Sequence, residues 1–216
     1  MSPPVLVDTP LGPAAVRTAG PGSAAGPGSA VGTLVLGHGA GGATDGPDLL
    51  AVTAAAAAAG WRVLRVDQPW RVAGKRIAPA PPQLDVAWTA VLEALRSGGV
   101  LTGPLVVGGR SAGARVACRT AATLGADGVL ALAFPLHPPG RPERSRADEL
   151  RAAGVPLAVV QGGTDAMGRP EEVAAALAGV PAASVHAVPG DHSLGKAPDA
   201  VAAAALAWLE QLPLRC

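Results

Sequence analysis

Residues 105–117 read Leu-Val-Val-Gly-Gly-Arg-Ser-Ala-Gly-Ala-Arg-Val-Ala, and this stretch decides the fold. The apolar run Leu105–Val107 is rich in β-branched residues and is typical of a buried strand. A Gly-x-Ser-x-Gly segment follows at once, and an alanine-rich helical pattern follows that. We therefore predict a strand, a sharp turn that carries Ser111, and a helix. Strand and helix close up against each other at such a turn, so small residues are needed at Gly109 and Gly113.

Two further polar residues each follow a predicted strand. Residues 155–160 predict a buried parallel strand, and Asp165 lies in the loop after it. Residues 183–188 predict another strand, and His192 lies in the loop that follows. Because open α/β sheets place their ligand chemistry at the carboxyl ends of the strands, we expect Ser111, Asp165 and His192 to meet there. These residue types form a catalytic triad, in which the histidine takes the proton of a nucleophilic serine and the aspartate orients the histidine.

A glycine-rich loop supplies candidate groups for the charge that acyl transfer develops. Residues 33–36 predict a short buried strand, and Gly-His-Gly-Ala-Gly-Gly follows it at 37–42. Backbone N–H groups that point at the developing oxyanion are the usual means of stabilising it. We assign these donors to Ala40, in the loop, and to Ala112, the residue after the serine. No cluster of histidine, cysteine and carboxylate residues has the spacing of metal ligands, so we predict neither a metal nor a cofactor.

Several segments together carry a resemblance to the α/β-hydrolase superfamily, and within it to a compact, lid-less branch near the dienelactone-hydrolase-like proteins. They are His-Gly-Ala-Gly-Gly at 38–42, Arg-Val-Ala-Gly-Lys-Arg at 71–76, Gly-Gly-Arg-Ser-Ala-Gly at 108–113, Pro-Leu-His-Pro-Pro-Gly at 135–140 and Gly-Asp-His-Ser at 190–193. The order serine, aspartate, histidine along the chain is also the order in that superfamily. The resemblance covers about residues 33 to 195 and implies a single-domain α/β-hydrolase fold. Dienelactone hydrolases use a cysteine where this chain has Ser111, so the resemblance does not extend to their activity.

We therefore predict a serine hydrolase that cleaves a small ester or thioester through an acyl-enzyme. Peptidase, acyltransferase and perhydrolase chemistry use the same residues and stay open, as does the natural substrate. The alternative is a catalytically silent α/β-hydrolase-fold protein that acts as an interaction module. Some members of the resembled branch are subunits of chromatin-associated complexes, which is the reason for keeping this alternative.

Composition fits one domain over residues 1–216. The net charge of +1 gives no reason to expect nucleic acid or a membrane surface as a partner, and the single Phe and absent Tyr leave few groups for base stacking. The two cysteines and the lack of a readable signal peptide predict a cytoplasmic protein, with its oligomeric state open. Residues 19–32 are rich in glycine, proline and serine and predict a flexible loop.

Alternating strands and helices predict a mostly parallel sheet flanked by helices, which is an α/β fold. Only about twenty residues, 135–154, separate the strand after the serine helix from the strand before Asp165. They have room for one short helix around Asp148, so we expect a minimal cap and a shallow, open pocket. The remaining expected elements are an antiparallel hairpin at 5–7 and 14–17, strands at 61–66 and 129–134, and helices at 47–59, 84–96, 171–178 and 199–211.

Other polar residues are candidates for binding substrate or for supporting loops. His137 follows a predicted strand, and Arg71 and Arg76 lie in a basic loop suited to an anionic group, so all three are candidates for binding substrate. A solvated rim is the alternative for the two arginines. We expect His38 to brace the oxyanion loop and Asp67 to order a neighbouring loop.

Three rival interpretations fit less well. Asp191 competes with Asp165 as the acid, but it is adjacent to His192 and so poorly placed for an aligned hydrogen bond. The glycines at 37, 39 and 42 formally match a dinucleotide-binding fingerprint, but four residues separate them from the next helix. Residues 190–197 resemble a P-loop without its final Ser or Thr.

Overall fold

The computed structural model describes residues 3–21, 30–42 and 44–213, and a single β-sheet forms the centre of this part of the chain. The described strands follow one another in the order β1-β2-β4-β3-β5-β6-β7-β8 across the sheet. All neighbours from β4 to β8 run parallel, and β1 and β2 join one edge antiparallel. The strands are β1 (Val5–Val7), β2 (Ala14–Ala19), β3 (Thr33–Gly37), β4 (Arg62–Asp67), β5 (Leu105–Arg110), β6 (Gly128–Leu132), β7 (Leu157–Gly162) and β8 (Ala183–Val188).

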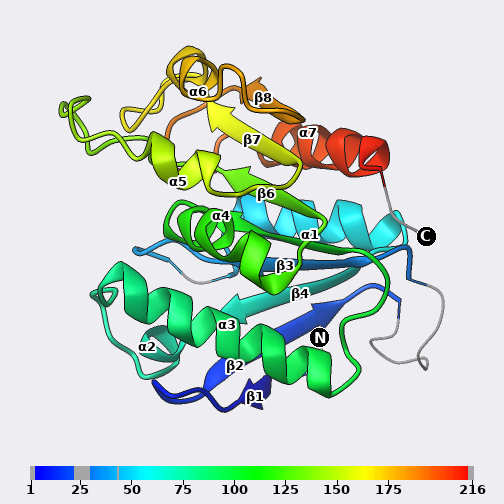
Figure 1. Ribbon diagram of the computed structural model, residues 1–216. Coiled ribbons are helices and arrows are strands. Elements are labelled where there is room, and N and C mark those ends of the chain that lie inside the picture. The colour runs from blue at the N-terminus through cyan, green and yellow to red at the C-terminus, as the bar shows by residue number, and fades with distance from the viewer. Residues whose placement is uncertain (1–2, 22–29, 43, 214–216) are drawn as a thin grey trace.

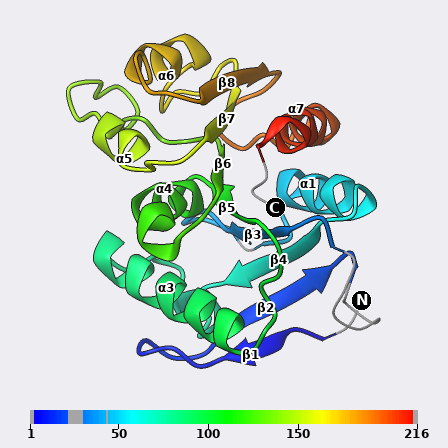
Figure 2. The ribbon, with the colours of Figure 1, turned by 45° about the vertical axis from the view of Figure 1, so that its right-hand side comes forward.

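Helices cover both faces of this sheet (Figures 1 and 2). Helices α1 and α7 lie on one face, and α3, α4, α5 and α6 lie on the other. The central strands β3 to β7 are almost entirely buried, as parallel strands covered on both faces must be, and they are mostly apolar apart from Arg62, Arg65 and Asp67 of β4. The helices are α1 (Pro47–Ala58), α2 (Pro69–Val72), α3 (Pro81–Ser97), α4 (Ala112–Leu124), α5 (Ala147–Arg151), α6 (Pro170–Ala176) and α7 (Pro198–Gln211).

This architecture confirms the predicted α/β fold with its mostly parallel sheet. The antiparallel hairpin is present, with Leu6 opposite Ala15. The connection from β6 to β7 contains only the short helix α5, so the minimal cap is confirmed as well. The expected loop at 19–32 begins one residue later, because Ala19 is the last residue of β2, and its residues 22–29 lie outside the described part of the chain.

Proline explains most of the differences at the helix starts. Five of the seven described helices begin with proline, including α3, which we predicted to begin at Leu84 but which begins at Pro81. Proline suits the first helical position because its fixed φ is helical and the N–H that it lacks would have no partner there. The sequence analysis missed α2, a single four-residue turn that starts at Pro69.

A very close backbone approach lies where β3, β5 and α4 meet. A Cβ added at Gly109 would lie 2.4 Å from the carbonyl oxygen of Gly37, and one added at Gly113 would lie 2.7 Å from the same atom. Gly109 also has a φ of 150°, which residues with a side chain rarely adopt. The expectation that small residues are required on both sides of Ser111 is therefore confirmed by the geometry.

We predict that Gly109→Ala lowers the free energy of unfolding by about 2 kcal/mol or more, because overpacking against backbone cannot relax by rotating a side chain. The measurement is equilibrium unfolding in urea. The control is Gly41→Ala, where an added Cβ has no atom within 4 Å and the stability should barely change. Equal losses in the two variants would contradict the steric explanation.

Candidate active site

Ser111 lies in the turn between β5 and α4, with a strained backbone. Its φ is 54° and its ψ is −108°, and it is one of four residues other than glycine with positive φ in the described chain. The Ser111 N–H donates to the carbonyl of Leu132 at 2.9 Å, which fixes the turn to the end of β6. Strain of this kind persists only where the surrounding structure enforces it, and it is frequent at functional sites.

A line of hydrogen bonds joins the three residues that we expected to meet. His192 Nε2 lies 2.9 Å from Ser111 Oγ, and His192 Nδ1 lies 2.8 Å from Asp165 Oδ2. Because a carboxylate oxygen can only accept a hydrogen bond, His192 Nδ1–H is the donor to Asp165, and Nε2 of the neutral ring has a free lone pair directed at the serine hydroxyl. Asp165 is fully buried, whereas about a quarter of the His192 side chain is exposed. The loops after β5, β7 and β8 thus bring the three side chains together at the carboxyl edge of the sheet.

Asp165 is held by more than the histidine. The Met167 N–H donates to its Oδ1 at 2.8 Å, and Gln161 Nε2 donates to its Oδ2 at 2.8 Å. Gln161 in turn accepts the Phe134 N–H at 2.9 Å and donates to the Gly168 carbonyl at 2.7 Å. Gln161 therefore ties the carboxylate of Asp165 to the loop after β6. Sequence reasoning missed this residue, although a polar residue near the end of an apolar strand was a usable signal.

Asp191 has a different task from Asp165. Its Oδ1 accepts hydrogen bonds from both the N–H and the hydroxyl of Ser193, at 3.0 and 2.6 Å. These bonds hold its pKa below the ordinary value. Its Oδ2 lies 3.6 Å from Lys196 Nζ. Asp191 therefore shapes the loop that presents His192 and makes no contact with the imidazole that Asp165 holds.

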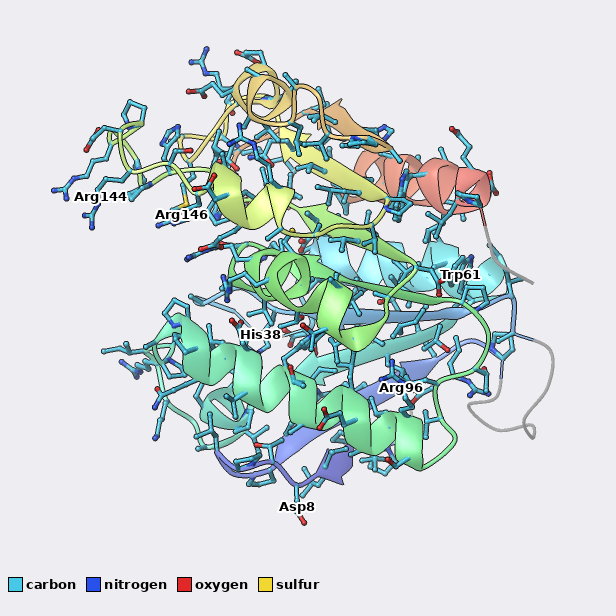
Figure 3. The ribbon with its side chains drawn as sticks, viewed as in Figure 1. Asp8, His38, Trp61, Arg96, Arg144 and Arg146 are labelled. Carbon is cyan, nitrogen blue, oxygen red and sulfur yellow. The ribbon has the colours of Figure 1, made fainter. Side chains whose placement is uncertain are left out.

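His38 connects the candidate oxyanion loop, residues 37–42, to the loop after β4. Its Nδ1 lies 2.8 Å from the Gly39 carbonyl and donates to it, and its Nε2 accepts the Gln68 N–H at 3.1 Å. Burial lowers the pKa of His38, so the neutral ring that this pair of bonds requires is favoured. Figure 3 shows His38 well inside the molecule. These contacts agree with a bracing role.

Asp67 orders the same loop, as we expected. Its Oδ1 accepts hydrogen bonds from both the N–H and the hydroxyl of Thr44 at 3.0 Å, and its Oδ2 accepts one from the Arg17 guanidinium. Although burial opposes it, this set of donors lowers the pKa of Asp67. The carboxylate is therefore ionised and holds the segment that leads into α1.

The two N–H groups assigned to the oxyanion are available. Across residues 3–21, 30–42 and 44–213, no atom accepts a hydrogen bond from the N–H of Ala40 or of Ala112. Gly39 brings the loop close to the serine, because a Cβ there would lie 3.4 Å from Ser111 Cβ. The assignment of Ala40 and Ala112 stays a prediction.

A sequence profile of the family described as Alpha/beta hydrolase domain matches residues 30–205. The chain belongs to this alpha/beta hydrolase family. No curated protein matches it by sequence.

Solved structures share this fold at low sequence identity. A serine hydrolase without a lid from Xanthomonas campestris has a TM-score of 0.77 at 19% identity, over 99% of this chain and 96% of its own. Est1E from Butyrivibrio proteoclasticus has a TM-score of 0.79 at 15% identity, over 98% and 99%. An esterase from Pyrococcus furiosus has a TM-score of 0.74 at 15% identity, over 97% and 91%. At such identities the likeness concerns the fold alone.

The three candidates for substrate binding in this hydrolase make contacts other than those of the candidate triad. His137 Nδ1 lies 3.0 Å from the Pro138 carbonyl, and its Nε2 lies 3.5 Å from Glu172 Oε1 of α6. Arg71, in α2, lines a groove with Arg17 beside β2, and Arg76 is exposed in the loop before α3. None of the three has a hydrogen bond to Ser111 or His192 among the described residues, and their roles stay predictions.

Two other features of the hydrolase bear on alternative chemistry. No group of three or more metal-binding side chains occurs in the part of the chain that the structure describes, and no described helix is long and apolar enough to cross a membrane. Cys118 lies in α4 with its side chain fully buried, and burial raises the pKa of its thiol to about 12. It is therefore not a competing nucleophile.

The arginine that precedes the serine contacts two loops of the candidate site and one carboxylate of α1. Arg110 Nη1 donates to the Ser193 carbonyl, next to His192, at 3.3 Å. Its guanidinium also lies against the oxyanion loop, since a Cβ at Gly42 would be 2.7 Å from Nη2. Asp48 is the only described carboxylate paired with it, at 3.8 Å. The sequence analysis missed Arg110, because the position before the serine has no fixed residue type in the motif.

Asp48 of this hydrolase is an unusual buried carboxylate. Its side chain is inaccessible, and neither oxygen has a hydrogen-bond partner among the described residues. Burial raises the pKa of Asp48, and the nearby Arg110 opposes the rise. The ionised form is therefore less favourable in the folded protein than in the unfolded chain.

We predict that Asp48→Asn gains stability relative to wild type as the pH rises from 4 to 7. A carboxyl with a raised folded pKa stabilises the fold at low pH, and this contribution is lost as the pH rises through the folded pKa. Urea unfolding at a series of pH values measures the difference between the two proteins. The Asp191→Asn control should show the opposite trend, because a lowered pKa contributes stability that is lost as the pH falls. A variant that loses stability relative to wild type toward pH 7 would contradict the prediction.

Proposed function

We propose that this chain is a serine hydrolase that cleaves a small ester or thioester, with Ser111 as the nucleophile. Membership of the hydrolase family leaves the reaction open, because one fold hosts many functions. The observation that carries the proposal is the line from Ser111 Oγ through the His192 ring to the buried Asp165, with distances of 2.9 and 2.8 Å. A structural serine gains nothing from a strained turn and an aligned base.

The proposed reaction has two halves. His192 Nε2 takes the hydroxyl proton as Ser111 Oγ attacks the substrate carbonyl carbon, and Asp165 stabilises the imidazolium that forms. His192 then gives the proton to the leaving alcohol or thiol, which departs and leaves the acyl group on Ser111. In the second half a water molecule attacks this acyl group and gives a proton to His192, which then returns it to Ser111 Oγ as the acid is released.

The N–H groups of Ala40 and Ala112 would hold the oxyanion in both halves. Their position is supported by the elbow geometry at Ala112 and by the bracing of the loop through His38. Preorganised donors of this kind contribute on the order of 3 kcal/mol each to the transition state.

The exposure of His192 and the short connection between β6 and β7 favour a small or flexible acyl substrate over a deeply buried lipid. An ester and a thioester would present the same carbonyl to Ser111. The peptidase, acyltransferase and perhydrolase alternatives use the same groups. A cytoplasmic location stays a prediction.

We predict that a fluorophosphonate probe adds to the wild-type protein at one probe per chain, because Ser111 Oγ displaces fluoride from phosphorus. Intact-mass measurement should show no addition to Ser111→Ala. The labelling rate of His192→Ala should fall at least about 100-fold, since a general base contributes that much or more.

The matched control is Ser184→Ala. Ser184 Oγ also lies 3.0 Å from a histidine nitrogen, that of His186, but on an ordinary strand and without an acid. Labelling should persist in this variant. Folded wild-type protein that takes no label would overturn the proposal and favour the interaction module.

Arg110 acts as a positioning residue in this mechanism. One guanidinium touches the oxyanion loop at Gly42 and the histidine loop at Ser193, so it holds both in register with the serine beside it. Planar arginine, with several fixed donors, suits this better than a flexible lysine.

We predict that Arg110→Met lowers the second-order labelling rate and kcat/KM for a simple ester by about tenfold to hundredfold, because displacement of reacting groups by about 1 Å has such an effect. Arg110→Lys should recover only part of the loss. The control is Arg119→Met on α4, which removes ion pairs to Asp85 and Glu149 at 2.6 and 2.8 Å without touching the site. If Arg119→Met reduces kcat/KM as much as Arg110→Met does, the effect is one of stability and the positioning role is wrong.

A further inference from the structure

A cavity of about 340 Å³ lies beside the candidate site, between α2, the start of α3 and the hairpin of β1 and β2. Trp70 and Pro69 come from α2, Ile77 and Ala78 from the loop before α3, and Leu11 from the hairpin. Its size falls in the range of ordinary small-molecule sites. The mechanism above makes no use of it.

The cavity leads toward the serine through shared walls. Gln68, Trp70 and Ala78 also line a second void, of about 10 Å³, which is bounded on its other side by Ala112 and Gly113. A substrate whose carbonyl oxygen accepts a hydrogen bond from the Ala112 N–H would therefore lie next to the wall formed by Gln68, Trp70 and Ala78.

A second path of contacts joins the same two places. The ring of Trp70 packs on His38 with 5.3 Å between centroids. The Nδ1–H of His38 donates to the carbonyl of Gly39, the residue that lies against Ser111. The cavity and the candidate oxyanion loop are thus parts of one packed unit.

The rim carries apolar side chains that folding leaves in water. Ile77 is 85% exposed and Leu11 is 43% exposed. Neither contributes to the core, and both line the cavity. Apolar surface left exposed around a concavity is typical of binding sites, because a ligand removes it from water.

The only charged side chain on the cavity wall is a cation. Lys75 lines the outer cavity but not the inner void, and no carboxylate lies within 4.0 Å of its Nζ in the described part of the chain. The wall contains no Asp or Glu. An anionic group would find its complement here, and a cationic group would not.

From these observations we infer that the cavity receives the acyl part of the substrate, and that this acyl group has an apolar body and an anionic far end. The inference rests on the proposed function and names its substrate class. The apolar body lies along Trp70 and Ile77, and the anionic end meets Lys75. Arg71 and Arg76, the two candidates from the sequence for binding an anionic group, do not line the cavity.

The test compares two esters with the same six-carbon acyl chain, 4-nitrophenyl hexanoate and the mono-4-nitrophenyl ester of adipic acid. They differ in ending with a methyl or a carboxylate group. Wild type should hydrolyse the adipate ester with the higher kcat/KM. Lys75→Gln should reduce this preference at least about threefold, as expected for an exposed ion pair, and Lys75→Glu should reverse it.

Two variants complete the design. Lys196→Glu makes the same change of charge on the histidine loop, outside the cavity, and should leave the preference unchanged. Ile77→Asp should reduce kcat/KM for 4-nitrophenyl hexanoate relative to kcat/KM for 4-nitrophenyl acetate. Because Ile77 is highly exposed, the substitution should leave the fold unaffected. A preference that Lys75→Glu leaves intact, or that Lys196→Glu changes equally, would overturn the inference.

A binding measurement separates this inference from the proposed function. Hexanamide and adipic acid monoamide are uncleavable counterparts of the two esters, and ligand-observed NMR with Ser111→Ala measures their affinities. Tighter binding of the monoamide that Lys75→Glu abolishes would support the cavity assignment even in a protein that takes no fluorophosphonate label. Equal binding of the two amides, or binding of neither, would reject the assignment even in a protein that is labelled.

Discussion

Backbone from three segments meets at Gly37, Gly109 and Gly113 with no room for a side chain at the last two. This contact sets the distance between the ends of β3 and β5, and it forces the chain to turn into α4 within one residue. The strain falls on Ser111, the residue at the apex, whose hydroxyl then stands clear of the sheet. The candidate oxyanion loop begins directly after Gly37, so the same contact also determines how closely that loop approaches the serine.

The remaining parts of the site are attached to this contact by buried polar groups. Gln161 ties the acid to the loop after β6, Asp67 ties the loop before α1 to β4, and Arg110 touches both the oxyanion loop and the histidine loop. Buried polar groups are costly unless they are paired, so each of these bonds strongly favours one arrangement of the loops. Asp48 is an exception, because its oxygens have no hydrogen-bond partner in the described chain.

Sequence reasoning predicted that Ser111, Asp165 and His192 meet, because each of these side chains follows an apolar strand. Period and composition reveal buried parallel strands, and the carboxyl ends of such strands share an edge. The same reasoning missed the supports. Arg110 and Asp48 lie far apart in the sequence and come close only in the folded protein, so no local sequence pattern predicts their contact. Gln161 was expected in the loop after the strand at 155–160, although it lies within β7, and α2 is too short to show a helical period. The cavity beside Trp70 was likewise invisible, since its walls come from three separate segments.

The tautomer of His38 couples the shape of the oxyanion loop to acidity. Its Nε2 accepts the Gln68 N–H only while that nitrogen is unprotonated; a second ring proton would set two donors against each other at 3.1 Å. Because the folded pKa is lowered, the stabilisation is complete above the ordinary histidine pKa and is lost as the pH falls through the folded value. Acid would therefore loosen the candidate oxyanion loop at His38. In the proposed reaction, the conformation of this loop would then contribute to any acid limb of the rate profile, apart from the proton transfer itself.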